Sequence, residues 1–234
     1  MVRTAPAQVN QSLVNGLTCL QELVLADRPV GVRELARQLG MDPTRVSRLL
    51  STLGWLGLAE QDENRKYHPG PGVHVLSALS LRGSHLLTRA LPVLRELAAE
   101  TGLVVALGVL WRSHVCYLYH GGEDTPLELA LGARGPFPAR QSSIGRVLLA
   151  ERSAAELAEF PEPESLADAL AEVRERGYAR GGVRGESLAV AVGQPAIAAL
   201  AVAGRIDLGM ETRLADRLRA AAAQIDSREP IVDQ

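Results

Sequence analysis

Cysteine, lysine and aromatic residues are scarce in this sequence. Its two cysteines, Cys19 and Cys116, lie too far apart to form a disulfide framework or a zinc finger. Aromatic residues make up 3% of the chain, which argues against a surface that stacks the bases of single-stranded nucleic acid. Lys66 is the single lysine, and the net charge is −2. Any nucleic-acid site must therefore be a local patch.

Long hydrophobic runs are also missing. The longest strongly apolar stretch, LVVALGVLW at 103–111, is too short to span a bilayer. The opening residues MVRTAPAQVNQSLV lack the apolar core of a signal peptide. We therefore expect a cytoplasmic protein that has no membrane partner.

No motif joins the serines, histidines and acids into a catalytic triad. We expect no enzymatic activity, no catalytic residue and no cofactor. His114, Cys116 and His120 fall on one face of a predicted strand, an arrangement that a metal site would share. Short matches of this kind are often false, so we expect ordinary strand residues and no metal.

The first 102 residues predict helices, a hairpin and then a connecting helix. Residues 12–25 predict a helix with Leu13, Leu17, Leu20 and Val24 on one face. Residues 57–70 predict a strand, a turn and a second strand. Residues 86–102 predict a connecting helix with two apolar faces, more than one core needs.

The second half predicts a mixed α/β domain. Short β-like runs occur at VVALGVL, HVCYLYH and PLELAL, and again at SLAVAV and PAIAALAVAG. SSIGRVLLA (142–150) predicts a helix, and two more are expected at 164–177 and 212–226. Ser153 and Glu156 have the spacing of a capping box.

Residues 31–53 predict a helix-turn-helix. The first helix buries Val32, Leu35, Ala36 and Leu39, and the second buries Val46, Leu49, Leu50 and Leu53. Gly40 ends the first helix. Asp42 caps the second, with Pro43 at its first position, where the missing N–H costs nothing.

On the second of these helices, the face opposite the buried residues carries arginines and hydroxyls. Thr44, Arg48 and Ser51 lie opposite the core and Arg45 and Ser47 flank them, with no acid between Thr44 and Thr52. An ordinary solvated face is the alternative, but short hydroxyls and bidentate arginines suit phosphates and base edges in a major groove. Arg65 and Lys66 sit where the tip of a wing could touch phosphate. Trp55 is expected to pack against the wing, and Trp111 inside the second domain.

Several ordered segments together resemble the IclR family of transcriptional regulators. "LARQLGMDPTRVSRLLSTLGWLGLAE" is similar to its DNA-binding domain, and "ALPVLRELAAETG" to its linker helix. "PARQSSIGRVLLA" resembles the segment Pro–Leu–His–Ala–small–small–x–Gly–Lys–x–x–Leu–Ala. "RERGYA" and "AIAALAVAG" resemble two later landmarks. The resemblance covers about residues 10–226.

The resemblance implies an α+β fold. An N-terminal winged helix-turn-helix (10–71) is joined by linker helices (72–102) to a GAF-like α/β domain (103–228) that binds an effector and assists oligomerisation. It implies a sequence-specific regulator with helix 43–53 in the major groove of a double-stranded operator. We expect a homodimer through the N-terminal region, possible pairing into a homotetramer, and control by a small effector. The alternative is a GAF-like ligand-binding or enzymatic module whose winged helix serves protein interaction.

The implied effector pocket lies between loop 140–145, loop 178–187 and strand 197–203. Its expected residues are Arg140, Ser142, Ser143, Ile144, Ala201 and Ala203. The serines sit at a predicted helix N-terminus, where free N–H groups favour an anion or carbonyl oxygen, although plain capping is an alternative. Arg140 stands at the family's histidine position, and the family's acidic loop is here the Gly-rich, basic run 180–185, which could also bind phosphate or be a flexible loop.

The two alanines leave the opposite wall apolar. We therefore expect a ligand with a sizeable apolar body and at most one polar or anionic end. The alternatives are a short carboxylate and regulation without an effector.

Overall fold

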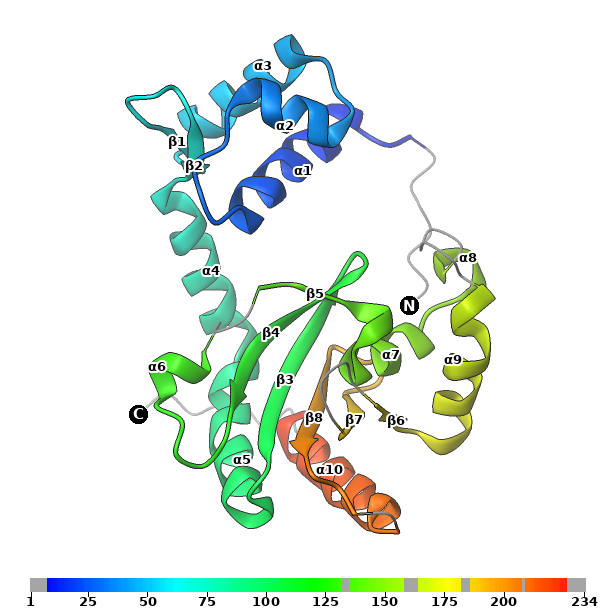
Figure 1. The fold of residues 1–234 in the computed structure, drawn as a ribbon. Coiled ribbons are helices and arrows are strands. Elements are labelled where there is room, and N and C mark those ends of the chain that lie inside the picture. The colour runs from blue at the N-terminus through cyan, green and yellow to red at the C-terminus, as the bar shows by residue number, and fades with distance from the viewer. Residues whose placement is uncertain (1–7, 132–134, 158–163, 182–185, 208, 227–234) are drawn as a thin grey trace. The chain divides into compact units, whose positions relative to one another are not determined.

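The structure is a computed structural model that describes residues 8–131, 135–157, 164–181, 186–207 and 209–226. Its described residues form two compact units, one ending at Ser84 and one beginning at His85 (Figure 1). Each unit has its own hydrophobic core and is described by itself.

The N-terminal unit is a winged helix-turn-helix followed by one further helix. Its order is α1 (Gln11–Leu25), α2 (Val32–Leu39), α3 (Pro43–Trp55), β1 (Ala59–Gln61), β2 (Tyr67–Pro69) and α4 (Pro71–Ser84). The two strands form an antiparallel hairpin, and Val30 adds a bridge to Tyr67. The predicted helix-turn-helix and wing are therefore present.

Local capping signals set the ends of α2 and α3. Gly40 ends α2 in the left-handed region, with φ 62°. The Asp42 carboxylate accepts hydrogen bonds from the amides of Thr44 and Arg45, at 2.9 and 3.1 Å. Pro43 occupies the first turn of α3. These contacts confirm the predicted caps.

The structure shows which side of α1 packs, which its periodicity does not determine. Leu13, Leu17 and Val24 share one face, as expected, and that face is exposed, whereas Leu20 at its edge is partly buried against the core. Cys19 and Leu23 lie buried on the opposite side. Small side chains on the inner side let α1 approach α3, and a Cβ at Gly16 would meet a Leu49 methyl group at 3.8 Å. Periodicity identified the residues that share a face but not the face that packs.

The C-terminal unit is built on one antiparallel sheet with the strand order β5-β4-β3-β8-β7-β6. The strands are β3 (Val104–Trp111), β4 (His114–Gly121), β5 (Phe137–Pro138), β6 (Ala179–Arg180), β7 (Glu186–Val192) and β8 (Ala198–Gly204). The helices are α5 (Leu86–Thr101), α6 (Leu127–Ala130), η1 (Ala139–Gln141), α7 (Ser143–Ala150), α8 (Ala154–Leu157), α9 (Glu164–Arg176) and α10 (Glu211–Asp226).

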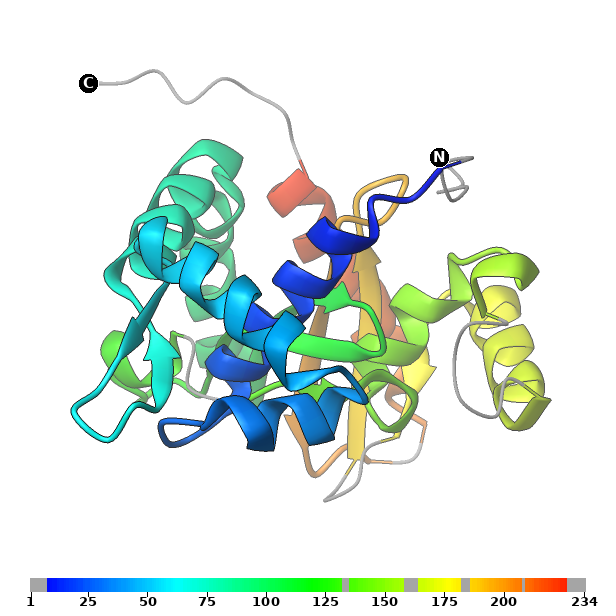
Figure 2. The same cartoon turned by 90° about the horizontal axis from the view of Figure 1, so that it is seen from above.

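Helices cover both faces of this sheet. One core joins α5 and α10 to one face through residues such as Leu97, Leu200 and Leu218. The other core joins α7 and α9 to the opposite face through residues such as Leu149 and Leu170. Figure 2 gives a second view of the arrangement. The α+β fold with a sheet-centred C-terminal domain agrees with the prediction.

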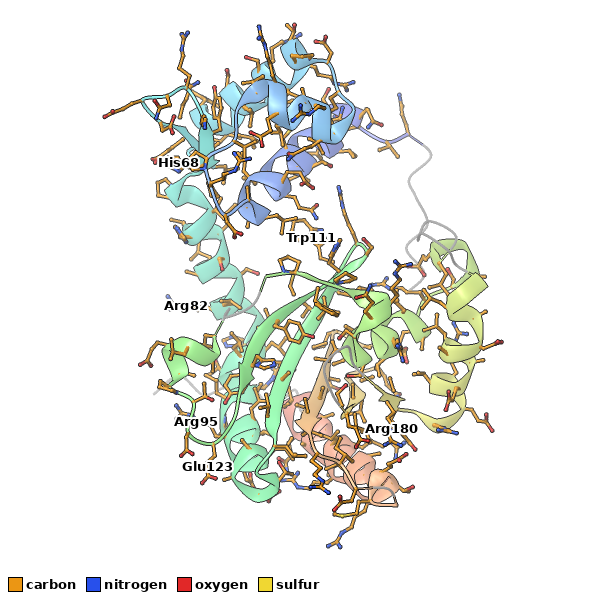
Figure 3. All side chains as sticks on the ribbon, viewed as in Figure 1. His68, Arg82, Arg95, Trp111, Glu123 and Arg180 are labelled. Atoms are coloured by element: carbon orange, nitrogen blue, oxygen red, sulfur yellow. The ribbon has the colours of Figure 1, made fainter. Side chains whose placement is uncertain are left out.

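Three details of the C-terminal unit differ from the prediction. The connecting helix α5 has no spare apolar face, because both of its faces pack into its own core: the residues are Leu86, Ala90, Val93, Leu94, Leu97 and Ala98, with Leu87 and Leu91 at its edge. The run PLELAL, predicted as a strand, contains the short helix α6, and only Leu131 forms a bridge, to Tyr119. Trp111 is 48% exposed near the tip of the β3–β4 hairpin (Figure 3).

The predicted capping box at the start of α8 is confirmed. The Glu156 carboxylate accepts hydrogen bonds from the Ser153 amide at 3.0 Å and the Ser153 hydroxyl at 2.9 Å. Arg152 adds an ion pair at 3.0 Å. The Ser153 amide, then its hydroxyl, and then Arg152 lower the pKa of Glu156 from 4.5 to about 2.

This pKa shift predicts acid sensitivity. A carboxyl whose pKa is lower in the folded state stabilises the fold above pH 4.5, and this contribution is lost as the pH falls toward 2. Wild-type protein should therefore melt at a higher temperature than Glu156→Gln at neutral pH, and the difference should shrink between pH 4.5 and 2. Glu151→Gln, which removes the same charge from an exposed neighbour outside the box, is the control. A difference that does not change with pH would contradict the assignment.

Candidate DNA-binding face and effector site

The exposed face of α3 presents the predicted arginines and hydroxyls to solvent. Thr44, Arg45, Arg48 and Ser51 are exposed and Ser47 is half-buried, while Val46, Leu50 and Leu53 anchor the other side. The helix contains no acidic residue. The face therefore carries positive charge and short donors, which is the chemistry that phosphates and guanine edges accept.

A buried amide on α1 holds one of these arginines in place. Asn15 is only 6% exposed. With its amide oxygen turned toward α3, that oxygen accepts hydrogen bonds from Arg45 Nε at 3.1 Å and Nη2 at 2.8 Å. Since both guanidinium nitrogens bind the same atom, the Arg45 head group is fixed at the edge of the face. Sequence analysis did not single out Asn15.

The wing presents the other two predicted residues. Arg65 and Lys66 are exposed in the β1–β2 turn. Arg65 has a φ of 59°, and its carbonyl accepts a hydrogen bond from Gln61. The Asp62 carboxylate accepts from the Lys66 amide at 2.7 Å. The turn is thus fixed by its own hydrogen bonds.

Trp55 does not pack against the wing as predicted. It is 85% exposed at the last residue of α3. The core of this unit is completed without it, by aliphatic residues and Tyr67.

The second predicted site surrounds the N-terminus of α7. Ser142 is its N-cap residue, yet its side chain makes no capping hydrogen bond. Its hydroxyl instead lies 3.3 Å from the Tyr117 hydroxyl. Ser142, Ser143 and Ile144 are buried, while Arg140 is exposed. Plain side-chain capping therefore does not account for Ser142.

Strand β7 supplies a further hydroxyl. Ser187 is hydrogen bonded to the Ser143 hydroxyl at 2.9 Å and also donates to the Gly181 carbonyl. Ser187 pairs with Ala203 in the sheet, and Ala189 pairs with Ala201. Ala201 is buried in the core beneath α7, and Ala203 is half-buried. Hydroxyls and small apolar side chains thus lie together on this part of the sheet.

Arg146 joins the two loops of this site. Its Nε donates to the Arg140 carbonyl at 3.0 Å, and its Nη1 donates to the Arg180 carbonyl at 3.3 Å. Because one guanidinium binds both main chains, the position of the first loop depends on that of the second.

The Arg180 side chain is paired with carboxylates. It contacts Glu186 at 3.1 Å and Glu211 of α10, and Figure 3 labels it. Glu186 also accepts from the Ile206 amide at 3.2 Å. The remainder of the Gly-rich basic run, 182–185, lies outside the described residues.

Sequence analysis missed Tyr117 and Ser187. Both come from strands far from α7 in sequence, and their facing depends on sheet register, including an irregularity between Leu107 and Gly108. No local motif encodes that register. Within the described residues, no three His, Cys, Asp or Glu side chains are grouped so as to hold a metal ion. None of the described helices is long and apolar enough to cross a membrane.

Two family profiles match this chain. "Bacterial transcriptional regulator IclR C-terminal" matches residues 78–227, and "IclR helix-turn-helix domain" matches residues 12–63. Together they include the helix-turn-helix and the whole described sheet.

Curated relatives are regulators. The chain is 30% identical to the HTH-type transcriptional regulator BhcR of Paracoccus denitrificans over 68% of this chain and 62% of BhcR. It is 30% identical to the transcriptional repressor IclR of Escherichia coli over 76% of this chain and 71% of that protein. The match thus spans less than two thirds of the length of BhcR.

Solved structures share the fold. An IclR family regulator from Brucella abortus superposes with a TM-score of 0.79 at 25% identity, covering 98% of this chain and 96% of that one. A putative regulator from a Silicibacter species gives 0.77 at 28% identity, with 93% and 95% covered. This chain belongs to the IclR family of DNA-binding transcriptional regulators, whose members are not enzymes.

Proposed function

We propose that this chain regulates transcription by binding a double-stranded DNA operator through α3. The exposed, acid-free face of α3, opposite a fully packed stripe, carries the proposal. Thr44, Arg48 and Ser51 enter the major groove, and Arg45 and Ser47 line its edge. Arg65 and Lys66 contact phosphate from the wing. We assign DNA binding to residues 10–71, linkage to 72–102, and effector binding and further assembly to 103–228.

Salt-dependent binding to genomic DNA tests this function. Genomic fragments that the purified protein enriches should contain a duplex that it binds. The association constant of the protein for that duplex should fall steeply with salt concentration, because each neutralised phosphate releases counterions. Absence of salt-dependent binding to any genomic fragment would overturn the proposal. A regulator of a bacterial chromosome acts in the cytoplasm, where we place this protein.

We further propose that the protein binds DNA as a homodimer, with pairing into a tetramer through the C-terminal units. One winged helix reads few base pairs, so two copies are needed for useful specificity. The spare apolar surface lies on α1 and α4 of the N-terminal unit. On α1, Leu13 and Leu17 are 61% and 49% exposed. On α4, Val75, Leu76 and Leu79 are each more than half exposed.

Introducing charge at the exposed leucines of α1 should separate the two copies of the chain in the proposed dimer. Leu13→Glu together with Leu17→Glu places two carboxylates in the proposed interface, where an unpaired charge is costly to bury. Light scattering at micromolar concentration should show a dimer or tetramer for the wild type and a smaller species for the variant. Arg95→Glu, at an exposed position of α5 in the other unit, is the charge control. A wild-type monomer would contradict the proposal.

The effector proposed for the C-terminal unit has an apolar body and one polar or anionic end. Ser142 and Ser143 receive that end at the start of α7, where the first-turn amides have no partner within the helix. Ala201 and Ala203 line the apolar side, with Ile144 beside them, and Arg140 lies at the entrance. A solved IclR homologue from Microbacterium hydrocarbonoxydans holds 4-hydroxybenzoate. That compound shares the apolar ring and the carboxylate but adds a hydroxyl at the far end, so benzoate is the matching probe and 4-hydroxybenzoate the comparison.

Thermal shift measurements distinguish the ligand classes, because a ligand of the folded state stabilises it by RT ln(1 + [L]/Kd). Aromatic monocarboxylates such as benzoate should raise the melting temperature more than acetate or lactate. Ala201→Leu should abolish the shift by filling the apolar side, and Tyr117→Phe should weaken it without adding volume. If only short acids act, and Ala201→Leu does not block them, the pocket is misplaced.

A further inference from the structure

Trp55 is more exposed than any other large hydrophobic side chain in the described part of the chain. It is 85% exposed at the last residue of α3. A tryptophan side chain has an apolar area that usually lies against another surface. The fold leaves this one without such a surface.

The position of Trp55 on the helix identifies the surface that it shares. At about 100° per residue, Trp55 lies within roughly 20° of Arg48 and about 40° of Ser51. It is seven residues after Arg48 and four after Ser51, both of which are exposed. Trp55 therefore continues the DNA-binding face by one turn.

Distance along the helix separates Trp55 from the base edges. At 1.5 Å per residue it lies about 10 Å beyond Arg48 along the axis. In a helix-turn-helix, the N-terminal part of the recognition helix contacts bases in a groove about 12 Å wide. The last residue of α3 accordingly reaches the sugar–phosphate backbone of the DNA strand that borders the groove.

The chemistry of indole suits that border. Its N–H is a donor without acceptor capacity, which matches phosphate oxygens, and its ring can cover deoxyribose carbons. No carboxylate in α3 competes for the donor.

We propose that Trp55 packs against the sugar–phosphate backbone at the edge of each half-site and donates its indole N–H to a phosphate oxygen. The inference rests on the proposed function and adds a contact that gives affinity without sequence preference. A second copy of the chain is a less suitable occupant, because Arg48 and Ser51 adjoin Trp55, whereas α1 and α4 each expose several leucine or valine side chains.

Substitution separates a backbone contact from a base contact. Trp55→Ala should weaken binding about tenfold, equivalent to about 1.4 kcal/mol, with the same factor for the enriched operator duplex and for a scrambled duplex. The slope of binding against salt should not change, because a neutral side chain releases no counterion. The DNA affinity of Trp55→Phe should fall between that of the wild type and that of Trp55→Ala. Trp111→Phe, which removes the other exposed tryptophan, should bind as the wild type does.

Fluorescence reports the contact directly. In Trp111→Phe, Trp55 is the only tryptophan, so operator addition should change its emission and protect it from acrylamide. A loss confined to the operator duplex would make Trp55 a base reader and overturn the inference. So would unchanged affinity in Trp55→Ala, or a loss of the oligomer in that variant. Wild-type protein that binds no DNA would overturn the proposed function as well.

Discussion

Gly145→Ala is expected to destabilise the C-terminal unit by about 3 kcal/mol or more, the upper range for overpacking a core. A Cβ at Gly145 would lie 2.1 Å from the Ala139 carbonyl oxygen and 2.4 Å from its Cα. These are backbone atoms of η1, so rotating a side chain cannot relieve the clash. The loop before α7, including Ser142, must move away from the helix.

Unfolding followed through Trp111 measures this effect, because Trp55→Phe leaves Trp111 as the only tryptophan, in the C-terminal unit. In that background, Gly145→Ala should unfold at a markedly lower urea concentration. Gly135→Ala is the control in the same unit, since no atom lies within 4 Å of the added Cβ, and it should leave the midpoint nearly unchanged. An unchanged midpoint for Gly145→Ala would show that the loop can move without cost.

Arg48→Ala is expected to weaken operator binding by roughly 1–3 kcal/mol, because a bidentate arginine contact to a guanine contributes about that much discrimination. The corresponding loss of affinity is about 5- to 150-fold. Specificity at one base pair should relax, in contrast to the uniform loss expected for Trp55→Ala. The fold should persist, since Arg48 is exposed opposite the buried stripe.

Titration of enriched operator variants with purified protein measures both changes. Thermal unfolding of Arg48→Ala should match the wild type. Arg95→Ala removes another exposed arginine, from α5, and should not alter binding. Wild-type affinity and specificity in Arg48→Ala would remove Arg48 from the DNA-binding face.

The helix-turn-helix was predictable because its determinants are local. Asp42 and Gly40 set helix ends within a few residues of themselves, and the stripe through Leu50 follows the helical period. The exposed side of α1 was not predictable, since Leu13 and Leu17 satisfy the same period whether they face inward or outward. Periodicity also identified two apolar faces on α5 without showing where they pack, and the structure buries both in one core.

The surroundings of the proposed effector site were only partly predictable for a related reason. Ser142 and Ser143 stand in one recognisable segment, so sequence located them. Tyr117 and Ser187 reach them only through the register of a sheet whose strands come from distant parts of the chain. The contact between Asn15 and Arg45 likewise joins two helices through tertiary packing.

Arg146 has a consequence for how such a site can change during evolution. Its guanidinium holds the carbonyl oxygens of Arg140 and Arg180 rather than their side chains. Every amino acid carries that oxygen, so either position can be exchanged while the attachment between the loops persists. Side chains at both positions can therefore change without first breaking the attachment, and a new ligand preference at the proposed effector site need not pass through an unfolded ancestor.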